Sequence, residues 1–213
     1  PKFPAAVLTV SGGHNELFIW KNHGEYKFLG ATLDDAAGEA FDKVARLLGL
    51  PYPGGPEIQK TALKGDAKRY PLPRAWLPEQ PWNFSFSGLK SAVLRLVKEH
   101  KMTPTFASDV AASFQDAVCD VLAKKVVNAA KKFKVKEIQL AGGVSANKRL
   151  REYVQREINS SLPILRFCEK IPLCTDNAAM IAAAGHFKFK KNPAKYKKWK
   201  PIIADPNLEI AEW

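Results

Sequence analysis

Leu8-Thr9-Val10-Ser11-Gly12-Gly13-His14-Asn15 is the stretch that decides the fold, and a similar stretch follows about 130 residues later, Ile138-Gln139-Leu140-Ala141-Gly142-Gly143-Val144-Ser145-Ala146-Asn147. Each is a short apolar run that ends at Gly-Gly and continues with small polar residues. Glycine pairs bring backbone N–H groups close to a ligand without Cβ interference, and amides at such turns bind anions. One such turn is ordinary. Two in one chain predict a nucleotide held from two sides.

Composition bounds the class of protein. The 213 residues suffice for one large domain or two small ones, and 46% hydrophobic with 25% charged residues is typical of a globular protein. No apolar run approaches the roughly 20 residues that cross a bilayer. The start, Pro1-Lys2-Phe3-Pro4, lacks a signal-peptide core, so we expect a cytoplasmic protein without membrane contact. It also lacks an initiator Met, so we expect a piece of a longer protein.

The net charge is the second global signal. A charge of +12 and a pI near 9.6 favour a polyanionic partner. Much of the excess lies in residues 187–200, where seven lysines alternate with aromatic side chains. We expect residues 188–213 to form a basic C-terminal tail. That tail is either merely solvated or a phosphate-backbone contact surface, with lysines such as Lys195, Lys197 and Lys198 carrying the charge.

Hydrophobic periodicity predicts the order of the secondary structure. Alternating runs indicate strands, and apolar spacings of three and four indicate helices. The expected strands are 7–10, 17–20, 26–29, 82–86 (an edge strand), 135–141 and 163–168. The expected helices are 37–48, 57–63, 89–99, one long or two shorter helices in 104–133, 147–158 and 176–190. A meander followed by alternating helices and strands predicts an α/β layer fold.

Three residues near the glycine turns are candidate ligand contacts. Asp42 lies in the first expected helix and is either a solvated charge or an acceptor for ribose hydroxyls. Gly55, thirteen residues later, could let the backbone cover a nucleoside. Asn147 follows the second Gly-Gly at a helix start, where it can cap the helix or contact the ligand.

Asp176 is the most specific single candidate for a site residue, because it stands at the start of an alanine-rich helix. It either favours the helix dipole or binds a metal ion. A metal site rarely rests on one carboxylate. The four histidines form no i, i+4 pair (His14, His23, His100 and His186). The three cysteines form no CxxC pair, so we expect them to be buried reduced thiols and not a zinc site (Cys119, Cys168 and Cys174).

Six segments together resemble the TsaD/Gcp family, the tRNA threonylcarbamoyladenosine synthases once called O-sialoglycoprotein endopeptidases. The segments are 8–15, Asp34-Asp35-Ala36-Ala37-Gly38-Glu39-Ala40-Phe41-Asp42-Lys43, Tyr52-Pro53-Gly54-Gly55-Pro56, Asn83-Phe84-Ser85-Phe86-Ser87-Gly88-Leu89-Lys90, 140–147 and Thr175-Asp176-Asn177-Ala178-Ala179-Met180. They run in family order from residue 7 to about residue 187. Segment 84–90 resembles the bacterial and organellar branch.

The resemblance implies a fold and a domain organisation. The expected fold is the two-lobed, actin-like and Hsp70-like ATPase fold, which is built on a ribonuclease H-like core. Residues 1–187 would be a Gcp-like domain, comprising the second lobe and the returning C-terminal helix, and 188–213 the basic tail. The first lobe would be missing, together with a His-x-x-x-His pair that binds iron or zinc beside Asp176.

The resemblance also assigns site residues, position by position. Thr9, Val10, Ser11, Gly12 and Gly13 would contact the phosphate of threonylcarbamoyl-AMP. Asp42 and Gly55 would hold the nucleoside, Asn147 would contact the same ligand, and Asp176 would be the one retained metal ligand. Some family members carry an acid four residues after the position of Gly55. This chain departs from those members, because Gln59 stands at that position.

The implied reaction is acyl transfer of the threonylcarbamoyl group to N6 of the adenosine just 3′ of the anticodon in tRNA. One divalent metal ion per subunit, iron or zinc, would polarise the carbamoyl group. The expected partners are tRNA and TsaB-like and TsaE-like companion proteins. No side chain resembles a nucleophile with its base, so we expect catalysis by positioning and electrostatics. Without the histidine pair, this chain alone is expected to be inactive.

Two alternatives stay open. The chain could be a non-catalytic scaffold or paralogue lobe that pairs with a catalytic partner, which the missing histidine pair favours. It could also be a small-molecule kinase of the same fold, such as a sugar or acetate kinase. A kinase would need a phosphoacceptor site with a catalytic Asp, and the segment 176–180 favours the transferase.

Overall fold

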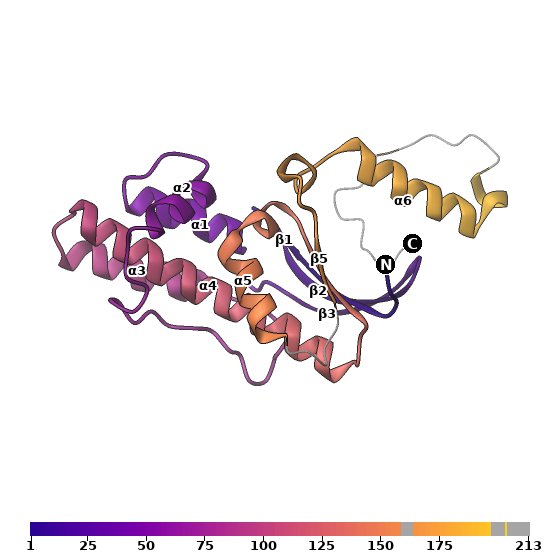
Figure 1. Cartoon of the computed structure of the whole chain (residues 1–213), viewed down its shortest axis with the longest axis horizontal. Coiled ribbons are helices and arrows are strands. Elements are labelled where there is room, and N and C mark those ends of the chain that lie inside the picture. Colours follow the sequence, from indigo (N-terminus) through magenta and orange to yellow (C-terminus); the bar gives the residue numbers. More distant parts are fainter. Residues whose placement is uncertain (159–163, 197–202, 204–213) are drawn as a thin grey trace.

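A mixed five-stranded sheet organises the molecule (Figure 1). The computed structural model describes residues 1–158, 164–196 and 203. The strands stand in the order β3-β2-β1-β4-β5. Strands β1, β2 and β3 form an antiparallel meander, whereas β4 and β5 continue the sheet parallel to β1. Their bounds are β1 Ala5–Val10, β2 Asn15–Asn22, β3 Glu25–Ala31, β4 Glu137–Ala141 and β5 Ile164–Phe167.

The alternation of side chains along β1 separates two apolar layers. Ala6, Leu8 and Val10 belong to the main core, which also contains buried residues of the helices. Ala5 and Val7 belong to a smaller cluster with Phe18 on the other face. This follows from the pleat, because successive side chains of a strand point to opposite faces.

Helix α4 is the centre of the helical layer. It contacts β1 and β4, and α1, α2, α3 and α5 all pack against it. Figure 1 shows these five helices gathered on one side of the sheet. Their bounds are α1 Ala37–Leu47, α2 Gly54–Ala62, α3 Ser87–Glu99, α4 Pro104–Lys132 and α5 Lys148–Glu157. The residues expected as one or two helices therefore form one, which begins at Pro104 after the N-cap Thr103.

The expected edge strand at 82–86 is wrong. Only an isolated bridge joins Phe84 to Thr32. The next residues turn toward Asp34, whose carboxylate accepts hydrogen bonds from the hydroxyls of Ser85 and Ser87 and from the amides of Phe86 and Ser87. Burial alone would raise the pKa of Asp34, but these hydrogen bonds outweigh it and lower the pKa. The segment therefore forms the anchored start of α3 instead of extending the sheet.

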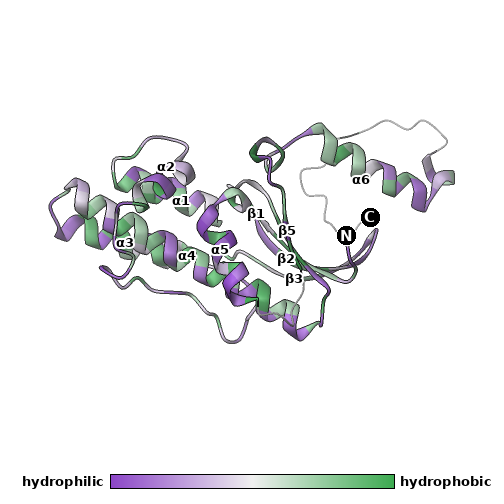
Figure 2. Cartoon of the chain, viewed as in Figure 1, coloured by the Kyte–Doolittle hydropathy of each residue, from purple (hydrophilic) through white to green (hydrophobic). Residues whose placement is uncertain are grey.

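Helix α6, Ala178–Lys191, lies apart from the other helices, on the far side of the sheet (Figure 1). None of its residues is buried, and Figure 2 shows hydrophobic residues near its start and hydrophilic ones near its end. It meets the β2–β3 turn, where the Phe187 ring stacks on His23 at 3.7 Å and Lys191 Nζ donates to Gly24 O at 3.0 Å.

The domain boundary expected between residues 187 and 188 falls inside α6, and it stays a prediction. Most of the expected basic tail, including Lys197 and Lys198, lies outside the described residues. Three short 3₁₀ turns complete the described elements: η1 Gly143–Ala146, η2 Ile171–Leu173 and η3 Pro193–Tyr196. No helix in the described part of the chain is long and apolar enough to cross a membrane.

A buried lysine fixes the proline-rich segment that precedes α3. Lys125 of α4 is only 2% exposed, and its ammonium donates to the carbonyl oxygens of Trp76 at 3.0 Å, Pro81 at 3.0 Å and Asn83 at 2.6 Å. Burial lowers the pKa of Lys125 to about 8, so the group still carries its charge at neutral pH. One side chain therefore satisfies three carbonyl groups of a segment that has no regular secondary structure of its own.

We expect Lys125→Met to lower the free energy of unfolding by about 2–4 kcal/mol, because three carbonyl groups lose their donor while the volume of the stem is kept. Cleavage by added protease within residues 73–83 should also become faster. Urea unfolding and timed proteolysis measure the two effects. Lys131→Met is the control: Lys131 is exposed in the last turn of the same helix, so its loss should cost about 0.5 kcal/mol. Equal stability of the two variants would contradict the role given to Lys125.

Candidate functional site

A cleft of about 480 Å³ opens where β1 and β4 end, between the first turns of α1 and α2 and the η1 turn. Because parallel strands end at the same edge of a sheet, both Gly-Gly turns reach this place. The cleft is lined by Gly12, Gly38, Phe41, Asp42, Tyr52, Pro53, Gly55, Pro56, Gln59, Gly143, Val144, Ala146, Asn147, Ile171 and Thr175.

The first glycine turn packs directly on the start of α1. The amides of Gly38 and Glu39 donate to Ser11 O and Gly12 O, each at 3.1 Å, and so satisfy part of the first turn of the helix. A Cβ at Gly38 would lie 2.5 Å from Ser11 O, so only glycine permits this approach. The amides of Gly12 and Gly13 make no hydrogen bond to any described residue, which leaves two donors for an anion.

The second glycine turn is held against β1. Gly142 has φ +83°, and a Cβ there would lie 2.3 Å from Val10 O. Both the left-handed backbone and the close contact require glycine. The η1 turn that follows carries Gly143, Val144 and Ala146 to the cleft wall.

Asn147 is an N-cap, one of the two roles expected for it. Its Oδ1 accepts from Leu150 N of α5 at 3.1 Å, and its Nδ2 donates to Gln115 Oε1 at 3.0 Å. The Cys119 thiol lies 3.9 Å from the same Oδ1, and burial raises its pKa, so this cysteine stays protonated. Asn147 is thus fixed by the protein before any ligand arrives.

Asp42 joins two helices at the cleft. Its Oδ1 accepts from Gly54 N, the first residue of α2, at 2.8 Å. A carboxylate at this position complements the N-terminal end of the helix dipole. It also explains why α2 begins at Gly54, three residues before the predicted start. The second carboxylate oxygen has no hydrogen bond to a described residue and remains available to a ligand.

The structure brings four of the eight predicted substrate-binding residues to the cleft: Gly12, Asp42, Gly55 and Asn147. The other four do not line it. Thr9 and Val10 belong to β1, and Val10 is fully buried. Ser11 Oγ accepts from His14 N within the turn, and Gly13 lies at its exposed tip. Contact of these four with the phosphate therefore stays a prediction.

Tyr52 and Gln59 are informative among the cleft residues that were not predicted contacts. Tyr52 is 83% exposed at the rim, although a large aromatic ring is normally covered. Gln59 lies one turn after Gly55 on α2 and accepts from Lys148 N at 2.7 Å. The four-residue spacing from Gly55 was a usable signal for Gln59, because residues at i and i+4 share one face of a helix.

Asp176 lies outside the cleft lining, next to Thr175, and is exposed. Helix α6 begins later than expected, at Ala178, with Asn177 as its N-cap. Among the described residues, no group of three or more His, Cys, Asp or Glu side chains could hold a metal ion. The described residues therefore do not fit a metal ion by themselves, and the role of Asp176 as a ligand stays a prediction.

Comparison with known proteins identifies the family. The family model "TsaD: tRNA N6-adenosine threonylcarbamoyltransferase" matches residues 1–183. The chain belongs to the TsaD family. Proteins named tRNA N6-adenosine threonylcarbamoyltransferase are similar to this TsaD-family chain: that of Bacillus subtilis is 54% identical over 99% of the chain, and that of Dehalococcoides mccartyi 53% over 89%. The chain spans 60% of the Bacillus protein and 56% of the Dehalococcoides protein.

Solved structures confirm the expected fold of this TsaD-family chain. HypF from T. kodakarensis superposes with a TM-score of 0.57 at 18% identity, covering 78% of the chain and 21% of HypF. Full-length HypF in a phosphate- and nucleotide-bound form superposes with a TM-score of 0.64 at 13% identity, covering 91% of the chain and 34% of HypF. At such identities the likeness concerns the fold alone, which is the actin-like ATPase fold.

Substitutions at two adjacent glycines distinguish a role in packing from a role in ligand contact. A Cβ at Gly54 would lie 2.7 Å from Ala45 Cβ, whereas a Cβ at Gly55 would meet no atom within 4 Å. We expect Gly54→Ala to lower the free energy of unfolding by about 1–3 kcal/mol through overpacking. Gly55→Ala should keep or slightly raise stability, because alanine favours helix, but its methyl group enters the cleft and should weaken AMP binding about tenfold. Urea unfolding and calorimetric titration with AMP measure both. Unchanged AMP affinity in Gly55→Ala would place the nucleotide elsewhere.

Proposed function

We propose that this chain is the nucleotide-binding part of a tRNA N6-adenosine threonylcarbamoyltransferase, which transfers the threonylcarbamoyl group from threonylcarbamoyl-AMP to the adenosine 3′ of the anticodon. The observation that carries the proposal is the convergence of Gly12, Asp42, Gly55 and Asn147 on one cleft in a chain of the TsaD family. These residues come from four separate segments of the sequence.

The cleft supplies groups suited to an adenylate. The free amide of Gly12 in the cleft lining, followed in the same turn by that of Gly13, is a donor for phosphate oxygens, and the free oxygen of Asp42 accepts from a ribose hydroxyl. Gly55 leaves room for the nucleoside beside the start of α2. Asn147 fixes η1 against α4 through Gln115, so the second wall of the cleft is already ordered.

The reaction needs no covalent enzyme intermediate. N6 of the adenosine attacks the carbamoyl carbon, the new C–N bond forms, and the bond from that carbon to the phosphate oxygen breaks. AMP leaves with the electron pair, and N6 releases a proton to solvent. The charge that grows on the leaving phosphate lies beside the glycine amides, which need no reorganisation to stabilise it. Positioning and these dipoles are the contribution of the described residues.

The proposed setting follows from the substrate. The partners are tRNA and, as companion proteins, TsaB-like and TsaE-like proteins, and the reaction takes place in the cytoplasm. Asp176 is proposed as one ligand of a divalent iron or zinc ion whose other ligands lie outside the described residues. That ion would polarise the carbamoyl group.

A chimera gives the direct test of the proposed activity. The chain is joined to the part of the Bacillus subtilis relative that it does not cover, and transfer of labelled threonine to tRNA is measured by nucleoside chromatography. We expect modified adenosine with the chimera. We expect none with the chain alone, because Asp176 has no described partners with which to hold a metal ion. Absence of turnover by the chimera would contradict the proposed function. Turnover by the chain alone would contradict the need for metal ligands outside the described residues.

Asp42→Asn tests the nucleotide contact separately. We expect AMP to bind to the chain about tenfold more weakly, because a hydrogen bond to a charged acceptor is worth about 1.5–3 kcal/mol. Asparagine can still accept from Gly54 N, so α2 should keep its position and urea unfolding should change little. Glu99→Gln, which removes one exposed carboxylate charge at the end of α3, should leave AMP affinity unchanged. Equal affinities of the two variants would exclude Asp42 from the site.

A further inference from the structure

A second hollow adjoins the cleft, between α2, α4 and the first turns of α5. We call it the α2–α5 groove. Its volume is about 430 Å³. It is lined by Gln59, Lys60, Ala62, Leu63, Gly65, Ala67, Ala112, Gln115, Lys148, Arg149 and Glu152. None of the residues assigned above to adenylate binding lines it.

Gln59 is the boundary between the two hollows, because it lines both. The first half of α2 faces the cleft through Gly55 and Pro56, and its second half faces the groove. On the opposite wall the same change occurs between Asn147 and Lys148. The hydrogen bond from Lys148 N to Gln59 Oε1 at 2.7 Å spans this boundary. A ligand longer than one nucleoside could therefore extend from the cleft across this bond into the groove.

The groove carries positive charge that is only partly paired with acidic side chains of the described residues. Arg149 is paired with Asp116 at 3.2 Å and with Glu152 at 3.4 Å. Lys148 is exposed and has no ion pair with any described residue. Lys60 has a 78% exposed side chain and reaches Glu57 only at 4.0 Å. Two ammonium groups, one on each wall, are thus available to a ligand of opposite charge.

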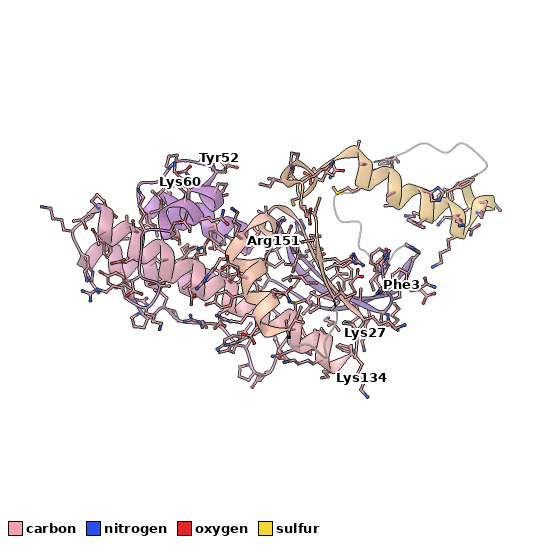
Figure 3. All side chains as sticks on the ribbon, viewed as in Figure 1. Phe3, Lys27, Tyr52, Lys60, Lys134 and Arg151 are labelled. Atoms are coloured by element: carbon pink, nitrogen blue, oxygen red, sulfur yellow. The ribbon has the colours of Figure 1, made fainter. Side chains whose placement is uncertain are left out.

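The remaining surface of the groove is suited to the less polar parts of a nucleotide. Leu63 is 83% exposed, and Ala62 and Ala67 lie beside it. At the other end of α2, the exposed ring of Tyr52 stands at the cleft rim. Figure 3 shows Tyr52 and Lys60 along the same edge of the molecule. Aromatic rings next to lysines are typical of surfaces that bind single-stranded nucleic acid.

We propose that the α2–α5 groove binds the backbone phosphates of the RNA nucleotides next to the adenosine that is modified, with Lys60 and Lys148 as the phosphate contacts. This inference rests on the proposed function, since it takes the substrate RNA from there. The continuity with the cleft favours RNA over an unconnected acidic protein. Bases in a single-stranded loop can also separate, so one nucleoside enters the cleft while its neighbours remain in the groove.

The test is a salt titration of RNA binding with the whole chain. The probe is an anticodon stem–loop RNA with an adenosine 3′ of the anticodon, and fluorescence anisotropy gives the affinity at each salt concentration. The double variant Lys60→Gln, Lys148→Gln should make the negative slope of log K against log salt less steep by about 1.4–1.8, since each lost phosphate contact removes about 0.7–0.9 from its magnitude. AMP affinity should stay unchanged, because neither lysine lines the cleft.

The matched control removes the same charge elsewhere. The control is the double variant Lys27→Gln, Lys134→Gln. Figure 3 shows these two lysines at another end of the molecule, far from Lys60. This pair should lower the slope much less than the groove pair. The proposal is wrong if the groove variant keeps the original slope, if the control pair has an equal effect, or if the chain binds no RNA.

The outcome of this test is independent of the transfer assay. A reduced slope in the groove variant, together with an inactive chimera, would leave an RNA-binding groove and remove the proposed reaction. An active chimera with an unchanged slope would keep the reaction and remove the groove.

Discussion

The parallel pairing of β1 with β4 is the constraint on which the cleft depends. Thr9 pairs with Ala141, so the two glycine turns that follow these residues are held at one edge of the sheet. The turns can approach only because Gly142 has no side chain against Val10 O, and Gly38 has none against Ser11 O. Any side chain at these two positions would force β1, η1 and α1 apart. The cleft is therefore a consequence of close backbone packing.

The polar side chains around the cleft serve the fold before they serve a ligand. Asp42 accepts from the first amide of α2, and Asn147 caps α5 while it holds Gln115. Both helices thus start at the cleft, and their positions are fixed by side chains that also line it. This arrangement orders the binding groups in advance, which reduces the entropy lost when a ligand binds.

Charge is distributed in two ways over the molecule. Near the helices, acids and bases are matched: Asp116 pairs with Arg74 and Arg149. Lys125 has no acidic partner among the described residues and is satisfied by three carbonyl groups instead. On the wall of the α2–α5 groove, Lys148 has no ion pair with any described residue. Exposed charge of this kind contributes little to stability, so its position is more informative about partners than about the fold.

The sequence by itself determined the family, the α/β layer order and most elements, because hydrophobic periodicity and glycine-containing motifs are local properties of the chain. It could not place residues 82–86, whose alternation resembles a strand until Asp34, about 50 residues earlier, binds the amides and hydroxyls there. The true start of α2 likewise depends on Asp42 in another helix. Only the tertiary structure decided which predicted contacts share the cleft, and that Gln59 separates it from a basic groove. The relative positions of these residues depend on contacts between segments that are distant in the sequence, and no local sequence pattern encodes such contacts.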